Sequence, residues 1–83
     1  MAEAESYVIN ERALTDDTLT LAPDGHTFKG GYVAIVTYHT FANPWSDDTH
    51  VRRFRSMAAM EAFVQRRYGK PWEALVFDGA EDD

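Results

Sequence analysis

The sequence predicts a small α+β domain, in which one α-helix packs on one face of an antiparallel β-sheet of about four to five strands. Three observations lead to this fold class. Residues 32–41 form a strongly β-type stretch, residues 57–68 carry apolar side chains at helical spacing, and turn-rich segments separate the other candidate strands. The 83 residues hold no cysteine and leave room for one hydrophobic core. We therefore expect a single domain at residues 6–78.

Two short strands are predicted before the central one. Residues 6–10 read Ser-Tyr-Val-Ile-Asn, and residues 18–22 alternate threonine with leucine. The sequence Pro-Asp-Gly at residues 23–25 then predicts a turn, because proline fixes φ, aspartate bonds the backbone two residues on and glycine takes a positive φ.

Residues 32–41 follow two glycines and carry β-branched and aromatic side chains on both faces, which predicts a central strand. Residues 49–55 are expected to return as its antiparallel partner, after a loop at residues 43–48. Residues 74–77 (Ala-Leu-Val-Phe) predict a short last strand beside this hairpin.

The helix is predicted over residues 57–68. Ser56 is a suitable N-cap, since its hydroxyl can accept from an amide of the first turn. Gly69 supplies a left-handed stop, and Pro71 blocks continuation. The predicted apolar face consists of Met57, Met60, Phe63, Val64 and Tyr68.

The ends of the chain differ from the domain in composition. Residues 1–5 and 79–83 are small or acidic and lack apolar periodicity, so we expect both to be disordered. The N-terminal end has neither the basic nor the apolar region of a signal peptide. The longest apolar stretch, within residues 32–38, is much shorter than the roughly 20 residues that span a bilayer. These features predict a cytoplasmic protein that has no membrane partner.

Charge is sorted along the chain into three blocks. Residues 1–48 carry a net charge of −6, residues 49–72 carry +5 and residues 73–83 carry −5, for a total of −6. Such patterning bears on association with partners rather than on fold. The overall acidity argues against general nucleic-acid binding, because lysine and arginine supply most of that affinity.

Catalytic and metal-binding patterns are weak. The spacings between His26, His39 and His50 are 13 and 11 residues, without the short intervals of a metal motif. His39 and His50 could approach each other in the hairpin, but we interpret them as sheet-surface histidines with ordinary hydrogen bonds. No serine sits in a nucleophile motif, and turn chemistry accounts for the adjacent aspartates. The sequence therefore predicts a non-enzymatic protein with no metal or cofactor.

An acidic surface is the first candidate for partner binding. Trp45 lies in the predicted hairpin loop, where recognition residues are often placed, and tryptophan is common at interaction hot spots. Spaced negative charge resembles a phosphate backbone and can occupy a basic groove of a partner. The predicted contact residues are Trp45, Asp47, Asp48, Asp16, Asp17 and Asp24. The alternatives are that Trp45 closes the core and that acidity keeps the protein soluble.

A basic surface is the second candidate. Arginines on the strand and late in the helix could grip phosphates, with Tyr68 or Trp72 stacking on bases. The residues of this alternative nucleic-acid site are Arg52, Arg53, Arg55, Arg66 and Arg67. They could equally form a solvated face that pairs with the chain's own carboxylates. A third interpretation is a dimeric accessory subunit that associates through an open sheet edge.

The chain resembles one class of small proteins. It is short, acidic and free of cysteine, with a strand that runs into Phe54-Arg55-Ser56 and a helix that ends in Arg67-Tyr68-Gly69. In these features it is similar to the small phage-encoded anti-CRISPR proteins. The resemblance implies a non-enzymatic inhibitor that acts in the host bacterial cytoplasm, as a monomer or homodimer. It implies binding to a Cas protein or crRNA-guided surveillance complex, with a block of target-DNA binding.

Overall fold

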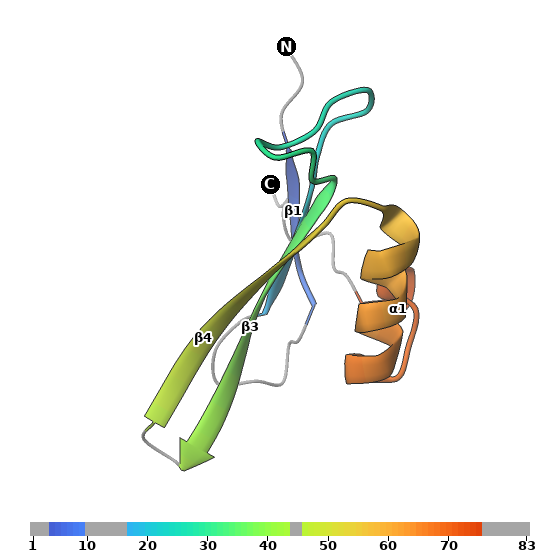
Figure 1. The fold of residues 1–83 in the computed structure, drawn as a ribbon. Helices are drawn as coiled ribbons and strands as arrows, with labels where there is room; N and C mark the ends of the chain where they lie inside the picture. The colour runs from blue at the N-terminus through green and yellow to red at the C-terminus, as the bar shows by residue number, and fades with distance from the viewer. Residues whose placement is uncertain (1–3, 10–16, 44–45, 76–83) are drawn as a thin grey trace, which may run out of the picture.

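The predicted helix on an antiparallel sheet is confirmed by a computed structural model, which describes residues 4–9, 17–43 and 46–75 (Figure 1). The sheet has four strands in the order β1-β2-β3-β4, and each neighbouring pair is antiparallel. The elements are β1 (Glu5–Val8), β2 (Thr18–Leu21), β3 (Ala34–Asn43), β4 (Ser46–Phe54), α1 (Met57–Tyr68) and α2 (Trp72–Leu75).

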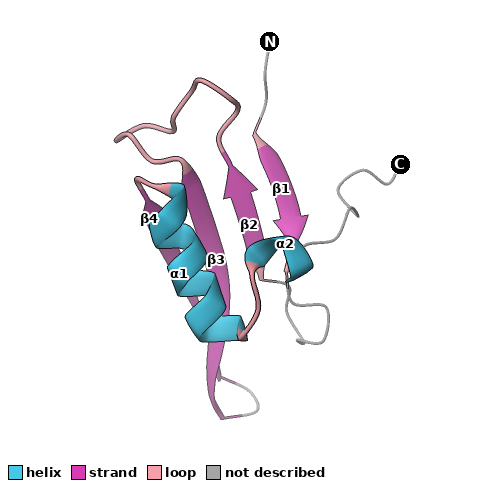
Figure 2. Cartoon of the chain, turned by 90° about the vertical axis from the view of Figure 1, so that its right-hand side faces the viewer, coloured by secondary structure: helices cyan, strands magenta, loops and turns pink. Residues whose placement is uncertain are grey.

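The strands differ in length, and this difference shapes the molecule. β1 and β2 have four residues each, whereas β3 has ten and β4 has nine. Thr37 is the last β3 residue that pairs with β2, through Thr18, and it also pairs with Val51 of β4. Beyond that point the β3–β4 hairpin extends past the short strands and past α1 (Figures 1 and 2). We call residues 37–43 and 46–51 the β3–β4 arm.

The core lies between the sheet and α1. Side chains alternate across a strand, so every second residue of the sheet faces the helix. Ala34 and Val36 of β3 are completely buried there, as is Leu19 of β2. The remaining buried apolar residues are Ile9, Phe54, Met60, Phe63 and Val64. No described element covers the opposite face of the sheet, which we call the open face (Figure 1).

Local sequence signals set the bounds of α1 where they were predicted. The Ser56 hydroxyl accepts a hydrogen bond from the Ala59 amide at 3.1 Å, which satisfies one unpaired donor of the first turn. Gly69 has a φ of 79° and its amide donates to the Gln65 carbonyl at 2.8 Å, closing the C-terminus. The predicted turn at residues 23–25 is confirmed as well: Gly25 has a φ of 79°, and the His26 amide donates to the Pro23 carbonyl.

Two sequence predictions about local structure are wrong. Residues 72–75 form the short helix α2 instead of starting a strand, while residues 76 and 77 lie outside the described part of the chain. Proline suits the start of a helix, and the Ala74 amide donates to the Pro71 carbonyl at 3.0 Å. Within the predicted loop at residues 43–48, residues 43 and 46–48 belong to strands. A bulge between Phe41 and Asn43 adjusts the register, so that β4 already begins at Ser46.

In the described part of the chain, no helix is both long enough and apolar enough to cross a membrane.

Candidate functional site

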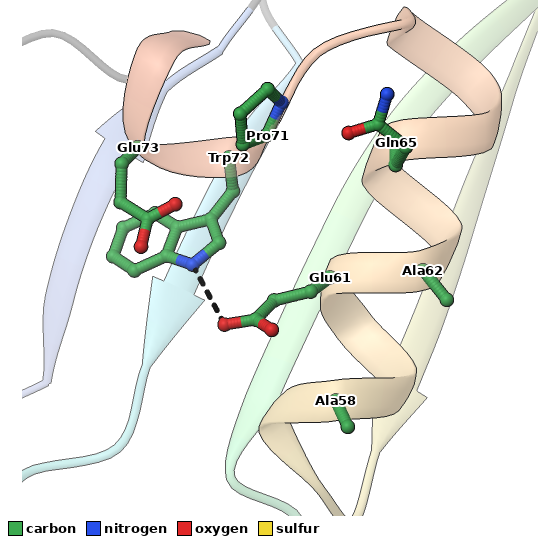
Figure 3. Close-up of a pocket in the computed structure, with 7 residues that line it drawn as sticks. All are labelled: Ala58, Glu61, Ala62, Gln65, Pro71, Trp72 and Glu73. Carbon is green, nitrogen blue, oxygen red and sulfur yellow. Dashed lines mark hydrogen bonds between the residues drawn. The ribbon is translucent and has the colours of Figure 1, made fainter.

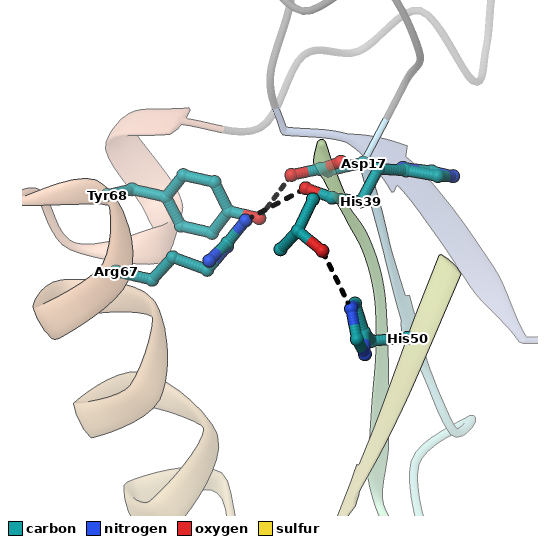
Figure 4. A network of polar contacts seen from close by, with 6 residues as sticks. Asp17, His39, His50, Arg67 and Tyr68 are labelled. Atoms are coloured by element: carbon teal, nitrogen blue, oxygen red, sulfur yellow. Dashed lines mark hydrogen bonds and ion pairs between the residues drawn. The ribbon is translucent and has the colours of Figure 1, made fainter. Parts of the chain in front are cut away.

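Asp17 is buried and joins three elements of the fold. It lies directly before β2, and only 1% of its surface is exposed. The Tyr68 hydroxyl at the end of α1 donates to Asp17 Oδ2 at 2.6 Å, and His39 Nδ1 of β3 donates to Oδ1 at 2.9 Å (Figure 4). A buried carboxylate is tolerated when donors satisfy it in this way. This placement corrects the expectation that Asp17 presents charge to a partner.

The same contact affects Tyr68. Burial raises the pKa of the Tyr68 hydroxyl far above its usual range, and the hydrogen bond to Asp17 adds to the effect. The hydroxyl therefore keeps its proton at neutral pH and acts as a fixed donor. Tyr68 is thus engaged within the fold instead of being free to stack on a nucleic-acid base, as the basic-surface interpretation required.

Next to this network lies a continuous stack of arginine and aromatic side chains. The Arg67 guanidinium lies 4.3 Å from the centroid of the Tyr38 ring, and its Nη2 donates to the His39 carbonyl at 3.1 Å. The centroid of the Phe63 ring lies 5.4 Å from that of the Tyr38 ring, and the Arg52 guanidinium lies 5.0 Å from the Phe63 centroid. These contacts hold the end of α1 against the base of the arm.

His50 extends this stack along the arm. Its ring lies 4.9 Å from that of Tyr38 with an interplanar angle of 19°, and its Nε2 is hydrogen-bonded to Thr40 Oγ1 at 2.9 Å (Figure 4). His50 pairs with Tyr38, the residue that precedes His39 in β3. The side chains of His39 and His50 therefore lie on opposite faces of the hairpin and contact different residues. Among the described residues, no group of three or more potential metal ligands lies close together.

The five arginines do not form the single patch that the basic-surface interpretation needs. Arg52 and Arg67 lie on the helix side of the sheet, whereas strand alternation places Arg53 on the open face. Arg55 lies beyond the other end of α1, where its Nε donates to the Gly30 carbonyl at 3.1 Å. The 12 residues of α1 separate Arg55 from Arg67 by roughly 18 Å along the helix axis. Arg66 is exposed on the helix.

The predicted acidic residues are also dispersed. Asp24 is exposed in the β2–β3 connection, at the end of the molecule opposite the arm (Figure 1). Asp48 is exposed in β4, opposite Thr40 of β3, and its neighbour Asp47 pairs with Phe41 of β3. Asp16 and Trp45 lie outside the described residues.

Between α1 and α2 lies a shallow groove of about 400 Å³ (Figure 3). Trp72 forms one wall, where its Nε1 donates to Glu61 Oε2 at 3.3 Å. The indole also packs 6.4 Å from the Tyr7 ring, so Trp72 is engaged in the fold and is not a free base-stacking residue. The lining residues are Ala58, Glu61, Ala62, Gln65, Pro71, Trp72 and Glu73.

The arm carries the two large apolar side chains that are most exposed in the described structure. Phe41 is 42% exposed and Val51 is 44% exposed. Both follow the alternation that places Ile35 and Thr37 on the open face. The sequence, with apolar side chains on both faces of residues 32–41, did not indicate that one face is uncovered. The available signal was the length of the apolar stretch at residues 32–41, which exceeds what the four-residue strand β2 can pair with.

Comparison with protein-family models gave no match, and comparisons with curated proteins and with solved structures also found nothing similar.

Proposed function

We propose that this protein is a non-enzymatic inhibitor that binds a Cas protein or crRNA-guided complex and blocks the binding of target DNA. The β3–β4 arm is its contact element. The observation that carries this proposal is the position of Phe41 and Val51, which expose apolar surface on an element that extends beyond the rest of the fold. Exposed apolar side chains that gather on one element are typical of a protein-binding surface.

The negative charge of the arm supports a partner with a basic surface. Asp48 is exposed on the arm, on the face opposite to that of Phe41 and Val51, and Asp47 precedes it in β4. A basic groove that binds nucleic acid is complementary to an acidic element, and such complementarity guides and accelerates association. The identity of the partner as a crRNA-guided complex follows from the resemblance to small anti-CRISPR proteins. The dispersal of the arginines makes direct nucleic-acid binding the weaker alternative.

The test mixes the purified protein with representative crRNA-guided complexes and follows co-elution and the gel shift of target DNA. We expect co-elution and loss of the shift, and we expect Phe41→Ser and Asp48→Lys to weaken both. Asp24→Lys is the matched control, because it makes the same charge change at the other end of the molecule. Equal weakening by Asp24→Lys and Asp48→Lys would exclude the arm as the contact element.

DNA alone is included in the same assay. Direct binding that falls steeply with salt would favour the arginine alternative, since neutralised phosphates release counterions. Failure to co-elute with any complex, together with no binding to DNA, would refute both candidate functions for the partners tested.

A further inference from the structure

β4 is an unusually long edge strand. It ends the sheet order, so one side pairs with β3 and no described element pairs with the other. Its nine residues span about 30 Å, whereas β1 at the opposite edge has four. An edge strand presents unpaired amides and carbonyls to any other strand that can reach it. Figure 2 shows β4 at the end of the sheet, beside β3 and partly behind α1.

The direction of the backbone groups in β4 follows from its pairing with β3. The Phe54 carbonyl accepts from the Val33 amide at 2.8 Å, so the backbone groups of Phe54 face β3. In an antiparallel ladder this orientation alternates along the strand. The amides and carbonyls of Thr49, Val51 and Arg53 therefore face outward at the open edge.

The charges of β4 are inverted about its centre. The strand reads Ser-Asp-Asp-Thr-His-Val-Arg-Arg-Phe, with His50 in the middle. Asp48 stands two residues before His50 and Arg52 two residues after it, while Asp47 and Arg53 stand three residues away. Among the described residues, no ion pair neutralises Asp48, Arg52 or Arg53. The strand is thus complementary in charge to its own reversed copy.

We propose that two copies of this chain associate by antiparallel pairing of their β4 edges, with His50 opposite His50 across a two-fold axis. This register places Asp48 opposite Arg52 of the second copy and Asp47 opposite Arg53, and symmetry repeats each pair. It also sets Thr49 opposite Val51, so that outward-facing backbone groups meet and exchange hydrogen bonds. The result is one continuous sheet of eight strands, a closed and isologous arrangement.

The charge pattern selects both the partner and the register. Charged side chains on an edge strand ordinarily discourage pairing, because an unrelated strand leaves them unmatched. A shift of the dimer register by two residues moves Asp48 opposite His50 or Phe54, and all four ion pairs are lost. Opposite charges directly across a strand pair are stabilising, and like charges are destabilising. Val51, which is 44% exposed, gains a cross-strand neighbour in the same register.

The test exchanges the charges and measures mass in solution by light scattering over a range of concentrations. Wild type is expected at twice the chain mass of 9.4 kDa, with a weaker dimer at high salt. D47R/D48R and R52D/R53D each place like charges across the axis, so each is expected to be monomeric. An equimolar mixture of these two variants restores every ion pair and is expected to form a heterodimer.

A matched control separates the edge from net charge. R66D/K70D makes the same total charge change as R52D/R53D, but on exposed positions at and after the end of α1, and is expected to stay dimeric. Circular dichroism verifies that each variant is folded. A monomeric wild type at all concentrations, or variants that remain dimeric on their own, would overturn the proposal.

Cysteine substitution tests the register directly, since the natural chain has no cysteine. Cα atoms of a non-hydrogen-bonded antiparallel pair lie about 4.5 Å apart, which a disulfide can bridge. His50→Cys is therefore expected to form a disulfide-linked dimer under mild oxidation. Ser46→Cys is expected to remain unlinked, because the two copies of residue 46 lie eight positions apart, about 27 Å. Efficient linkage at residue 46 and none at residue 50 would refute the register.

This inference does not depend on the proposed function. R52D/R53D is expected to be monomeric while retaining Phe41, Asp47 and Asp48 of the arm, so its inhibition can be measured without the dimer. Loss of dimerisation with retained co-elution would separate the two surfaces. A dimer that binds no crRNA-guided complex would contradict the proposed function alone.

Discussion

The helix-covered half of the sheet and the β3–β4 arm are built from the same two strands but have different surroundings. In the covered half, Ala34 and Val36 of β3 are completely buried beneath α1. In the arm, Phe41 of the same strand is 42% exposed, and beyond Thr37 the strand β3 pairs with β4 but not with β2. Burial is thus concentrated where the helix and the short strands contribute, and the arm leaves apolar surface in solvent. A small domain can expose apolar surface in this way only where its core does not require it.

The sharpest test of this comparison truncates one residue in each half. Met60 of α1 is completely buried, so Met60→Ala is expected to lower the free energy of unfolding by about 2–5 kcal/mol. Phe41→Ala removes a larger side chain from the arm but is expected to cost less than about 1 kcal/mol, since much of that side chain is already in solvent. Urea unfolding followed by circular dichroism measures both. Similar losses would mean that the arm belongs to the core.

The second test concerns the buried carboxylate at the boundary between the two halves. Asp17→Ala leaves the Tyr68 hydroxyl and the His39 ring without their acceptor, so we expect a loss of about 1–3 kcal/mol. Asp24→Ala is the matched control, because Asp24 is exposed and its replacement is expected to change stability by less than about 0.5 kcal/mol. Equal effects in the same unfolding assay would show that the network does not stabilise the fold.

The third test uses alkaline pH. The pKa of Tyr68 is raised in the folded protein by burial and by the bond to Asp17, while an unfolded tyrosine titrates near a pKa of about 10. Below pH about 10 both states keep the proton, and the stabilisation is fully present. As pH rises towards the folded pKa, the unfolded state loses its proton first and stability falls.

Tyr68→Phe removes the hydroxyl and, with it, the part of the pH dependence of stability that comes from Tyr68. The variant is expected to be less stable than wild type at neutral pH, through the lost hydrogen bond, and to show a shallower decline above pH about 10. Because the Tyr68 ring is only partly buried, we expect the effect to be smaller than that of Asp17→Ala. Thermal unfolding at neutral and alkaline pH provides the comparison. Parallel declines of the two proteins would contradict the assignment to Tyr68.

The smallest effect is expected where α1 meets the base of the arm. Arg67→Ala removes the contact with the Tyr38 ring and the hydrogen bond to the His39 carbonyl, at a cost of about 1 kcal/mol. Arg66→Ala, its neighbour on the exposed side of the helix, is expected to cost less than about 0.5 kcal/mol. Chemical unfolding of the pair measures the difference. If the order were reversed, the arginine–aromatic stack would have no stabilising role.

Much of the fold was predictable because its signals are local. Ser56 and Gly69 mark the ends of α1 by their own backbone chemistry, and the apolar residues between them identify the buried face of the helix. The loop at residues 43–48 was harder to predict. Its polar sequence is equally compatible with a solvated loop and with an exposed hairpin, and cross-strand pairing decided for the hairpin.

The candidate sites were less predictable. Asp17 has the sequence environment of a surface aspartate, and its burial depends on Tyr68, which lies 51 residues further along the chain. The arginines are close in sequence, but strand alternation and the length of α1 separate them in space. Their closeness along the chain was therefore a poor guide to whether the arginines form one binding surface.

The α+β class, the central hairpin and the helix with its two ends can all be recognised in the sequence, because turn, cap and periodicity signals act over a few residues. It also contained the inverted charges of β4. Three features are visible only in the folded chain: β4 is an edge strand, the arm extends past the core, and Asp17 is buried. These features depend on which distant segments pack together, and packing is settled by long-range burial and hydrogen bonding that no local pattern encodes.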